Sequence, residues 1–338
     1  MKLFDRFKGK PTRGAANRVV VTDIEKLKAD GREDLSKQLD IPKSVLERFL
    51  ELLKIRQVDV ASTDSTLREM AKQYTIFYER VVQVAAADSV VTELQSQAVG
   101  ALEEARFDRA EALLNEASDH DVRIAQSAPE EEARERLLAA AGRKAANGGV
   151  REAELEYQAA ADYYREAVQL VPAGEDLTLA EYLVDRGRLL ITLGLYAAAE
   201  APVARALAIR EAKLETEHLK STETLNYFGW VYNEQGRYAE AEPLYQRSLA
   251  IREKALGPEH PTTRVVRDNL EQSLEDWQKA SDDSESSTPL NYYAYSGFSR
   301  QQCGGPGSFP ATLPRTNALL GIHRLPVPAA TVDRSAMT

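Results

Sequence analysis

Several residue types are scarce in this sequence. Cys303 is the only cysteine, which excludes an intramolecular disulfide and fits a reducing compartment. Aromatic residues amount to 7%, and no segment alternates β-branched and polar residues as a half-buried strand does. Glycine and proline are sparse between residues 21 and 280, where Ala, Leu, Glu and Arg dominate and favour helix. These deficits predict an all-α protein.

Long apolar runs are missing too. The longest, residues 189–199, is shorter than the roughly 18 residues that span a bilayer, and the basic start MKLFDRFKGK has no apolar core of a secretory signal behind it. We therefore expect a cytoplasmic protein without a transmembrane segment. The formal net charge is −10, although residues 1–20 are basic. An acidic body disfavours nucleic acid and suits a partner with basic segments.

Motifs for catalysis or ligand binding are absent. The glycine-rich stretch 303–307 lacks the flanking strand and helix of a phosphate loop, and Cys303 has no base partner. His218 and His260 recur without a third ligand, so we interpret them as loop histidines that bond a neighbouring repeat rather than as metal ligands. We predict no enzymatic activity, no cofactor, no metal and no small-molecule substrate.

The positive signal in the sequence is internal repetition. Residues 194–218 match residues 236–260 at a constant spacing of 42, without a gap. A repeat of this size is a helix pair that stacks on copies of itself. In the last full copy the pattern predicts one helix over 222–235, closed by Gly236 in a left-handed conformation, and a second over 239–256.

A family resemblance rests on the residues of this copy, namely Leu225, Gly229, Tyr232, Tyr238, Ala241 and Tyr245. They resemble the tetratricopeptide repeat (TPR). The stretch 236–263, GRYAEAEPLYQRSLAIREKALGPEHPTT, is similar to the longer repeats of kinesin light chains and their bacterial relatives. The resemblance implies an α-solenoid, a right-handed superhelix of antiparallel helix pairs whose concave groove is lined by the first helix of each pair. It also implies a non-catalytic scaffold that binds a peptide or helix of a partner protein.

The register of the resemblance places eight residues in that groove: Val184, Asp185, Arg188, Thr192, Asn226, Tyr227, Trp230 and Asn233. An asparagine can bond a peptide backbone, Tyr227 and Trp230 offer stacking area, and Arg188 offers a fork for a carboxylate. An open alternative is that Trp230 packs against the preceding repeat. Gly229 is expected to face Ala241 where the two helices cross.

The predicted organisation has six parts: a basic disordered N-terminus (1–20), an N-terminal helical region (21–88), degenerate TPR-like pairs (89–178), two kinesin-light-chain-like TPRs (179–262), a polar capping helix (263–280) and a disordered tail (281–338). Gly148 takes the glycine position of a first helix within the degenerate pairs. The charged segment 118–146 is predicted as one long helix.

The N-terminal region carries a rival signal. Residues 33–56 resemble the middle of a helix-turn-helix, with Lys43, Arg48 and Lys54 on the second helix. This predicts an alternative function, a regulator that touches DNA through these helices while the TPR region senses a partner. Acidic residues surround the segment and weigh against it. The alternative requires salt-sensitive DNA retention that disappears when residues 1–60 are deleted.

Overall fold

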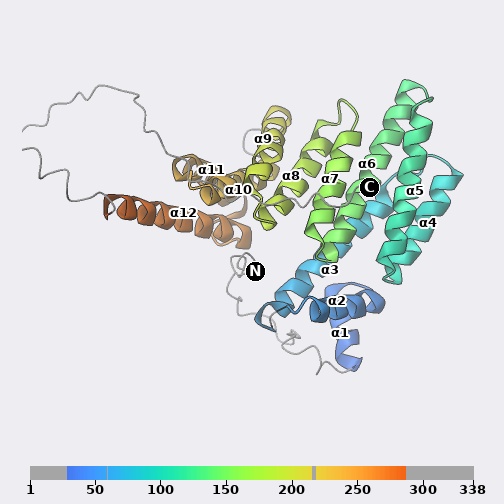
Figure 1. Cartoon of the computed structure of the whole chain (residues 1–338), viewed down its shortest axis with the longest axis horizontal. Helices are drawn as coiled ribbons and strands as arrows, with labels where there is room; N and C mark the ends of the chain where they lie inside the picture. Colours follow the sequence, from blue (N-terminus) through green and yellow to red (C-terminus); the bar gives the residue numbers. More distant parts are fainter. Residues whose placement is uncertain (1–28, 59, 215–217, 287–338) are drawn as a thin grey trace, which may run out of the picture. The chain divides into compact units, whose positions relative to one another are not determined.

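The architecture is entirely helical. In this computed structural model, residues 29–286 are described, apart from 59 and 215–217. Twelve α-helices and no strand occur among them (Figure 1), which confirms the predicted all-α class. The helices are α1 (Ala29–Leu39), α2 (Lys43–Ile55), α3 (Val60–Gln83), α4 (Ser89–Glu103), α5 (Phe107–Ala125), α6 (Glu130–Ala153), α7 (Tyr157–Leu170), α8 (Asp176–Thr192), α9 (Tyr196–Lys213), α10 (Leu219–Glu234), α11 (Tyr238–Leu256) and α12 (Pro261–Ser286).

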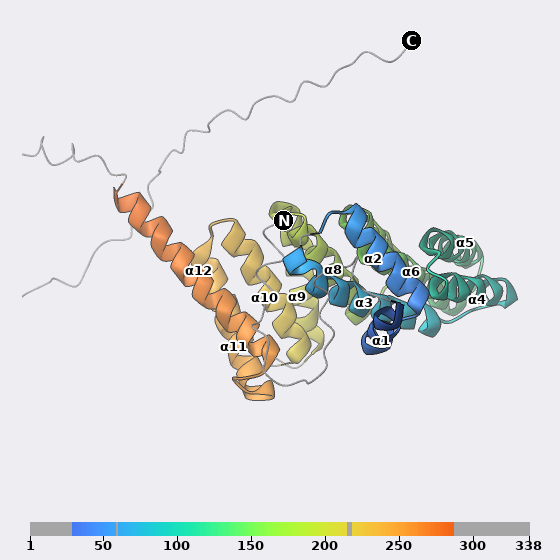
Figure 2. The same cartoon turned by 90° about the horizontal axis from the view of Figure 1, so that it is seen from below.

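Helices α4 to α11 form four pairs, α4/α5, α6/α7, α8/α9 and α10/α11. The two helices of each pair contact one another, and α6 with α5, α8 with α7 and α10 with α9 join each pair to the next (Figures 1 and 2). This succession confirms the α-solenoid. No helix of the described segments combines the length and apolar character needed to cross a bilayer.

The turn inside each pair has the same backbone conformation. Gly194 and Gly236 have φ values of 74° and 72°, and Ala105 and Leu155 have 57° and 61° at the equivalent places. In all four turns the next N–H donates to the carbonyl five residues earlier, which is the pattern that ends a helix with a left-handed residue. The predicted left-handed Gly236 is confirmed, and the two upstream turns repeat its geometry without a glycine.

Glycines also set how closely the two helices of a pair approach. Three first-helix glycines each meet a side chain sixteen positions later on the second helix: Gly148 with Tyr164, Gly187 with Val203 and Gly229 with Tyr245. A Cβ on Gly229 would lie 3.0 Å from the Tyr245 ring. The expectation that Gly229 faces Ala241 is therefore wrong, because the larger Tyr245 is the closest neighbour on α11.

Two predicted boundaries need correction. Residues 118–146 are not one helix, because α5 ends at Ala125 and α6 begins at Glu130. Pro129 precedes α6 with φ −55°, and a proline suits a helix start but has no N–H to continue a helix through itself. At the other end α12 extends through 281–286, which were assigned to the tail. The rest of that predicted tail, with Cys303, and the predicted basic N-terminus lie outside the described residues.

Helix α3 packs along α6. Helix α6 is rich in Ala and Gly, so α3 can come close. A Cβ on Gly149 would lie 2.5 Å from the Cβ of Phe77, and one on Gly142 would lie 2.8 Å from Val84. Phe77 is fully buried, so α3 is part of the same core as α6.

A buried ionic cluster joins α5 and α6. Arg143 and Asp121 are both 0% exposed, and Arg143 Nη1 donates to Asp121 Oδ2 at 2.6 Å. Arg136 Nη1 donates to the other carboxylate oxygen at 3.1 Å. Each charge is therefore neutralised by the chain itself, as burial requires.

Candidate functional site

The equivalent positions of the first helices define one surface, here called the first-helix face. The reference points are the three glycines at which the helices of a pair approach closely, Gly148, Gly187 and Gly229. The face consists of the residues three and two positions before each glycine and one position after it. These are Ala145, Ala146 and Gly149 on α6, Val184, Asp185 and Arg188 on α8, and Asn226, Tyr227 and Trp230 on α10. The same spacing of 42 continues the face onto α12, at Asp268, Asn269 and Gln272. These three residues are not among the eight predicted groove residues, although the repeat spacing points to them.

On α6 the face is covered by the chain itself. Phe77 of α3 lies against Gly149, and Arg80 Nη1 donates to the Ala145 carbonyl at 3.3 Å. Ala146 is buried in the hydrophobic cluster that contains Phe77. The small side chains of this part of the face make room for α3.

On α8 the end of α3 reaches the first predicted groove residues. Arg80 Nη2 donates to Glu181 Oε1 at 3.1 Å and to Asp185 Oδ2 at 3.4 Å. Its guanidinium also lies 5.5 Å from the Tyr182 ring centroid. Asp185 is thus paired with an arginine of the same chain.

The other predicted groove residues of α8 are also engaged. Arg188 donates from Nη1 and Nη2 to the two carboxylate oxygens of Glu152, at 2.7 and 2.6 Å. The fork expected for a partner's carboxylate is therefore filled by α6. Thr192 Oγ1 donates to the Arg188 carbonyl at 3.0 Å, and Val184 is buried in a cluster with Ala180 and Leu183.

On α10 the predicted residues form the wall of the face rather than its open surface. Asn226 is 8% exposed, and its Oδ1 accepts from Asn269 Nδ2 of α12 at 3.0 Å. Trp230 is 5% exposed and belongs to the same buried cluster as Leu190 and Ile191 of the preceding repeat. This placement matches the alternative that the sequence left open for Trp230.

A cavity of about 150 Å³ lies between α10, α11 and α12. Its lining consists of Trp230, Asn233, Tyr245, Asp268, Asn269 and Gln272. Asn233 is 8% exposed, and its Oδ1 has no hydrogen-bond partner among the described residues. The site thus brings together Trp230 and Asn233 of the predicted set with the three α12 residues of the first-helix face.

Tyr227 adds a neutral hydroxyl to this surface. Burial raises the pKa of the Tyr227 hydroxyl above its usual value, and the charge of Glu223 adds to the effect. The hydroxyl therefore stays protonated at neutral pH and can donate or accept a hydrogen bond. Asp268 on α12 is an exposed carboxylate at this end of the face, and Glu223 on α10 is exposed too but pairs with Arg210 at 3.8 Å.

The recurring histidines begin helices. His218 Nδ1 accepts from the N–H of Lys220 at 3.1 Å at the start of α10. His260 Nδ1 accepts from the N–H of Thr262 at 3.3 Å beside the start of α12. Both rings satisfy an N–H of the helix that follows them, rather than bonding a neighbouring repeat as expected, because the first N–H groups of a helix lack intrahelical partners.

The helix-turn-helix candidate is formed by α1 and α2. Arg48 Nη2 donates at 3.0 Å to Oε1 of Glu154, the residue that follows α6. Arg48, one of the three basic residues predicted to contact DNA, therefore contacts the repeats. Lys43 and Lys54 are exposed. No observation on these helices favours a DNA contact over the packing role.

Comparison with known proteins bears on the C-terminal pair. The sequence profile of the tetratricopeptide repeat family matches residues 222–262, which cover most of α10, all of α11, the loop after it and the first two residues of α12. No curated protein matches the sequence. The profile match, the constant spacing of the repeats and the stacked helix pairs together support a tetratricopeptide repeat protein.

Proposed function

We propose that this protein is a non-catalytic scaffold that binds a peptide or helix of a partner protein on the first-helix face of α8, α10 and α12. The wall of the site is formed by residues of two helices. They are Asn226, Tyr227, Trp230 and Asn233 of α10 and Val184, Asp185, Arg188 and Thr192 of α8. Exposed Asp268 and half-buried Asn269 and Gln272 of α12 form the rim of the site. Tetratricopeptide repeats and a solenoid suggest such a role, because stacked helix pairs provide extended interaction surfaces.

One observation carries the proposal, the unpartnered oxygen of Asn233 in the cavity beside Trp230. A buried acceptor without a partner costs about 1–3 kcal/mol of stability. A backbone N–H of a bound peptide would satisfy this oxygen, and Gln272 and Asn269 offer further amide groups next to it. A cavity bordered by amides is suited to the backbone of an extended chain.

The acidic rim favours a partner with basic residues. Asp268 and Glu223 are exposed at this end of the face, and complementary charge speeds association and selects among partners. We further propose that the repeats are of the longer kinesin-light-chain-like type found in bacteria, on the basis of their spacing and the Gly257-Pro258-x-His260-Pro261 loop. A cytoplasmic location is part of the same proposal.

The test uses a peptide selected on the full chain from a random library and then measured by titration calorimetry. Asn233→Leu keeps the approximate size of the side chain and removes its amide. Because the Asn233 oxygen has no partner among the residues that the structure describes, we expect unchanged or slightly higher stability, together with at least about tenfold weaker peptide binding.

Gln246→Leu is the matched control. Gln246 is an exposed amide on α11 outside the cavity, where it donates only to Glu242 within its own helix. This variant is expected to bind the peptide as the parent does. Equal binding by the Asn233 variant, or equal loss in both variants, would contradict the proposed site.

A further inference from the structure

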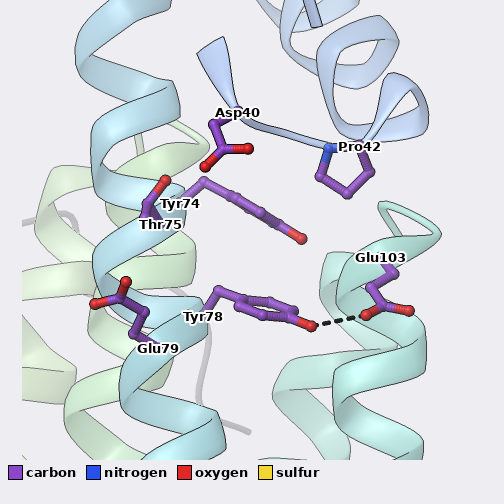
Figure 3. Close-up of a pocket in the computed structure, with 7 residues that line it drawn as sticks. All are labelled: Asp40, Pro42, Tyr74, Thr75, Tyr78, Glu79 and Glu103. Carbon is purple, nitrogen blue, oxygen red and sulfur yellow. Dashed lines mark hydrogen bonds between the residues drawn. The ribbon is translucent and has the colours of Figure 1, made fainter. Parts of the chain in front are cut away.

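A larger cavity lies outside the first-helix face, in the N-terminal part of the chain. It measures about 500 Å³ and is bordered by the turn between α1 and α2, the middle of α3 and the end of α4 (Figure 3). Seven residues line it: Asp40, Pro42, Tyr74, Thr75, Tyr78, Glu79 and Glu103. Neither the repeat pattern nor the proposed scaffold function uses them.

Two tyrosines of α3 form one wall of this cavity. The rings of Tyr74 and Tyr78 lie side by side with centroids 5.7 Å apart and planes inclined by 25° (Figure 3). Tyr74 is held from behind by Phe49 and Phe77, at centroid distances of 6.4 and 5.2 Å. Tyr78, by contrast, is only half-buried. The exposed part of the Tyr78 ring is therefore the aromatic surface of the wall, and the buried Tyr74 ring supports it before any ligand arrives.

The charges around the cavity have one sign. Asp40, Glu79 and Glu103 are exposed carboxylates, and none of them has an ion-pair partner among the described residues. The lining holds no lysine, arginine or histidine within the described part of the chain. Three carboxylates around tyrosine rings attract a cation both by charge and by the negative face of the rings.

The hydroxyl groups differ in their partners. Tyr78 donates to Glu103 Oε1 at 2.7 Å, which fixes that carboxylate at the edge of the cavity (Figure 3). Tyr74 is 3% exposed, and its hydroxyl has no hydrogen-bond partner among the described residues. Figure 3 shows its ring extending between Pro42 and Tyr78 toward the end of α4. A buried polar group left without a partner at a cavity is a group that a ligand can satisfy.

We propose that this cavity binds an organic cation, a guanidinium or alkylammonium group with its apolar stem. The stem lies along the Tyr78 ring, and the charged head lies against a carboxylate at the border of the cavity, where Asp40, Glu79 and Glu103 stand on different sides. The volume suits a side-chain-sized ligand rather than a bare metal ion, and the aromatic wall suits a head group that is only weakly hydrated. The same chemistry is offered by an arginine or lysine of a bound protein and by a free polyamine.

The test measures backbone amide chemical shifts of the full chain during titration with small probes. N-acetylarginine amide and N-acetyllysine amide represent a peptide side chain, and spermidine represents a free polyamine. N-acetylcitrulline amide has nearly the same shape as the arginine probe but no charge. We expect saturable shifts at Thr75, Tyr78 and Glu79 with at least one cationic probe, at about millimolar affinity, and no saturation with the citrulline probe. The probe that binds more tightly identifies the source.

Variants locate the cation. Asp40→Asn with Glu79→Gln keeps the shape of two exposed side chains, so folding is preserved, and binding is expected to weaken at least about fivefold. Tyr78→Leu, which removes one ring, is expected to weaken it as well. Glu69→Gln is the control, because Glu69 is an exposed carboxylate of the same helix outside the cavity. Saturation by the citrulline probe, no binding of any cation, or equal affinity in the double variant would overturn the proposal.

Discussion

The first-helix face is built differently in the two halves of the solenoid. On α6 its positions are Ala145, Ala146 and Gly149, and α3 of the same chain lies on them. On α10 and α12 the same positions hold amides, aromatic rings and a carboxylate around a cavity. Small residues occur on α6, where α3 of the same chain covers the face. Larger polar and aromatic residues occur where no other described helix covers the face.

The two halves also differ in how they satisfy buried polar groups. Arg143 and Asp121 in the N-terminal half neutralise each other inside the fold. Asn233 in the C-terminal half keeps an oxygen without a partner among the described residues. On the first-helix face, the α6 part is covered by α3 of the same chain, whereas the α10 part leaves the Asn233 oxygen for an external donor. Substitutions in each half test this difference.

The largest loss of stability is expected from removing a buried charge in the N-terminal half. Arg143→Met leaves Asp121 buried with only Arg136 as a partner, and we expect a loss of about 3–5 kcal/mol in the free energy of unfolding. Urea unfolding followed by far-UV circular dichroism measures it. Lys37→Met removes one member of an exposed pair with Glu33 and should change the free energy by less than about 0.5 kcal/mol. Similar losses in both variants would contradict the role given to burial.

Adding one methyl group should separate α3 from α6. Gly149→Ala puts a Cβ 2.5 Å from the Cβ of Phe77, and overpacking of this kind costs about 1–3 kcal/mol. The same urea titration measures the change. Gly100→Ala is the matched substitution within α4, where no atom lies within 4 Å of the added methyl, and it should stabilise by about 0.5–1 kcal/mol through helix propensity. A tolerated Gly149→Ala would mean that α3 does not lie tightly on this face.

Substitutions in the turns inside the pairs should change the free energy of unfolding by smaller amounts and in opposite directions. Ala105 and Gly236 occupy equivalent turns with φ values of 57° and 72°, and a left-handed residue other than glycine costs about 1 kcal/mol. Ala105→Gly should therefore raise the free energy of unfolding by about 0.5 kcal/mol, whereas Gly236→Ala should lower it by about 1 kcal/mol. Thermal and urea midpoints report both. A decrease in both variants would show that packing of the Ala105 methyl outweighs its backbone strain.

The sequence predicted the C-terminal half of the fold well because its signals are local. The Gly-x-Tyr turn and the constant spacing located α10 and α11 within a few residues, and the profile match covers the same pair. The repeat signal of the upstream pairs is weaker, because Ala105 and Leu155 occupy the turn positions that glycine occupies in the later pairs. The break at Pro129 was missed because helical residues continue on both sides of it.

Contacts between distant segments were beyond the reach of periodicity. Nothing in the pattern of α3 indicated that Arg80 would reach Glu181 and Asp185 on α8, about a hundred residues away in sequence. The same limit applies to Arg188, whose predicted free fork is filled by Glu152. The repeat register thus assigned the predicted groove residues to α8 and α10, whereas the partners of their individual side chains required the structure.

Amide hydrogen exchange on the full chain, with and without the selected peptide, tests the central claim most directly. The account predicts that the peptide protects amides of α10 and α12 and the facing end of α8, and leaves those of α6 and of the second helices α9 and α11 unchanged. Protection confined to α6, or to α9 and α11, would contradict the assignment of the first-helix face as the partner-binding surface.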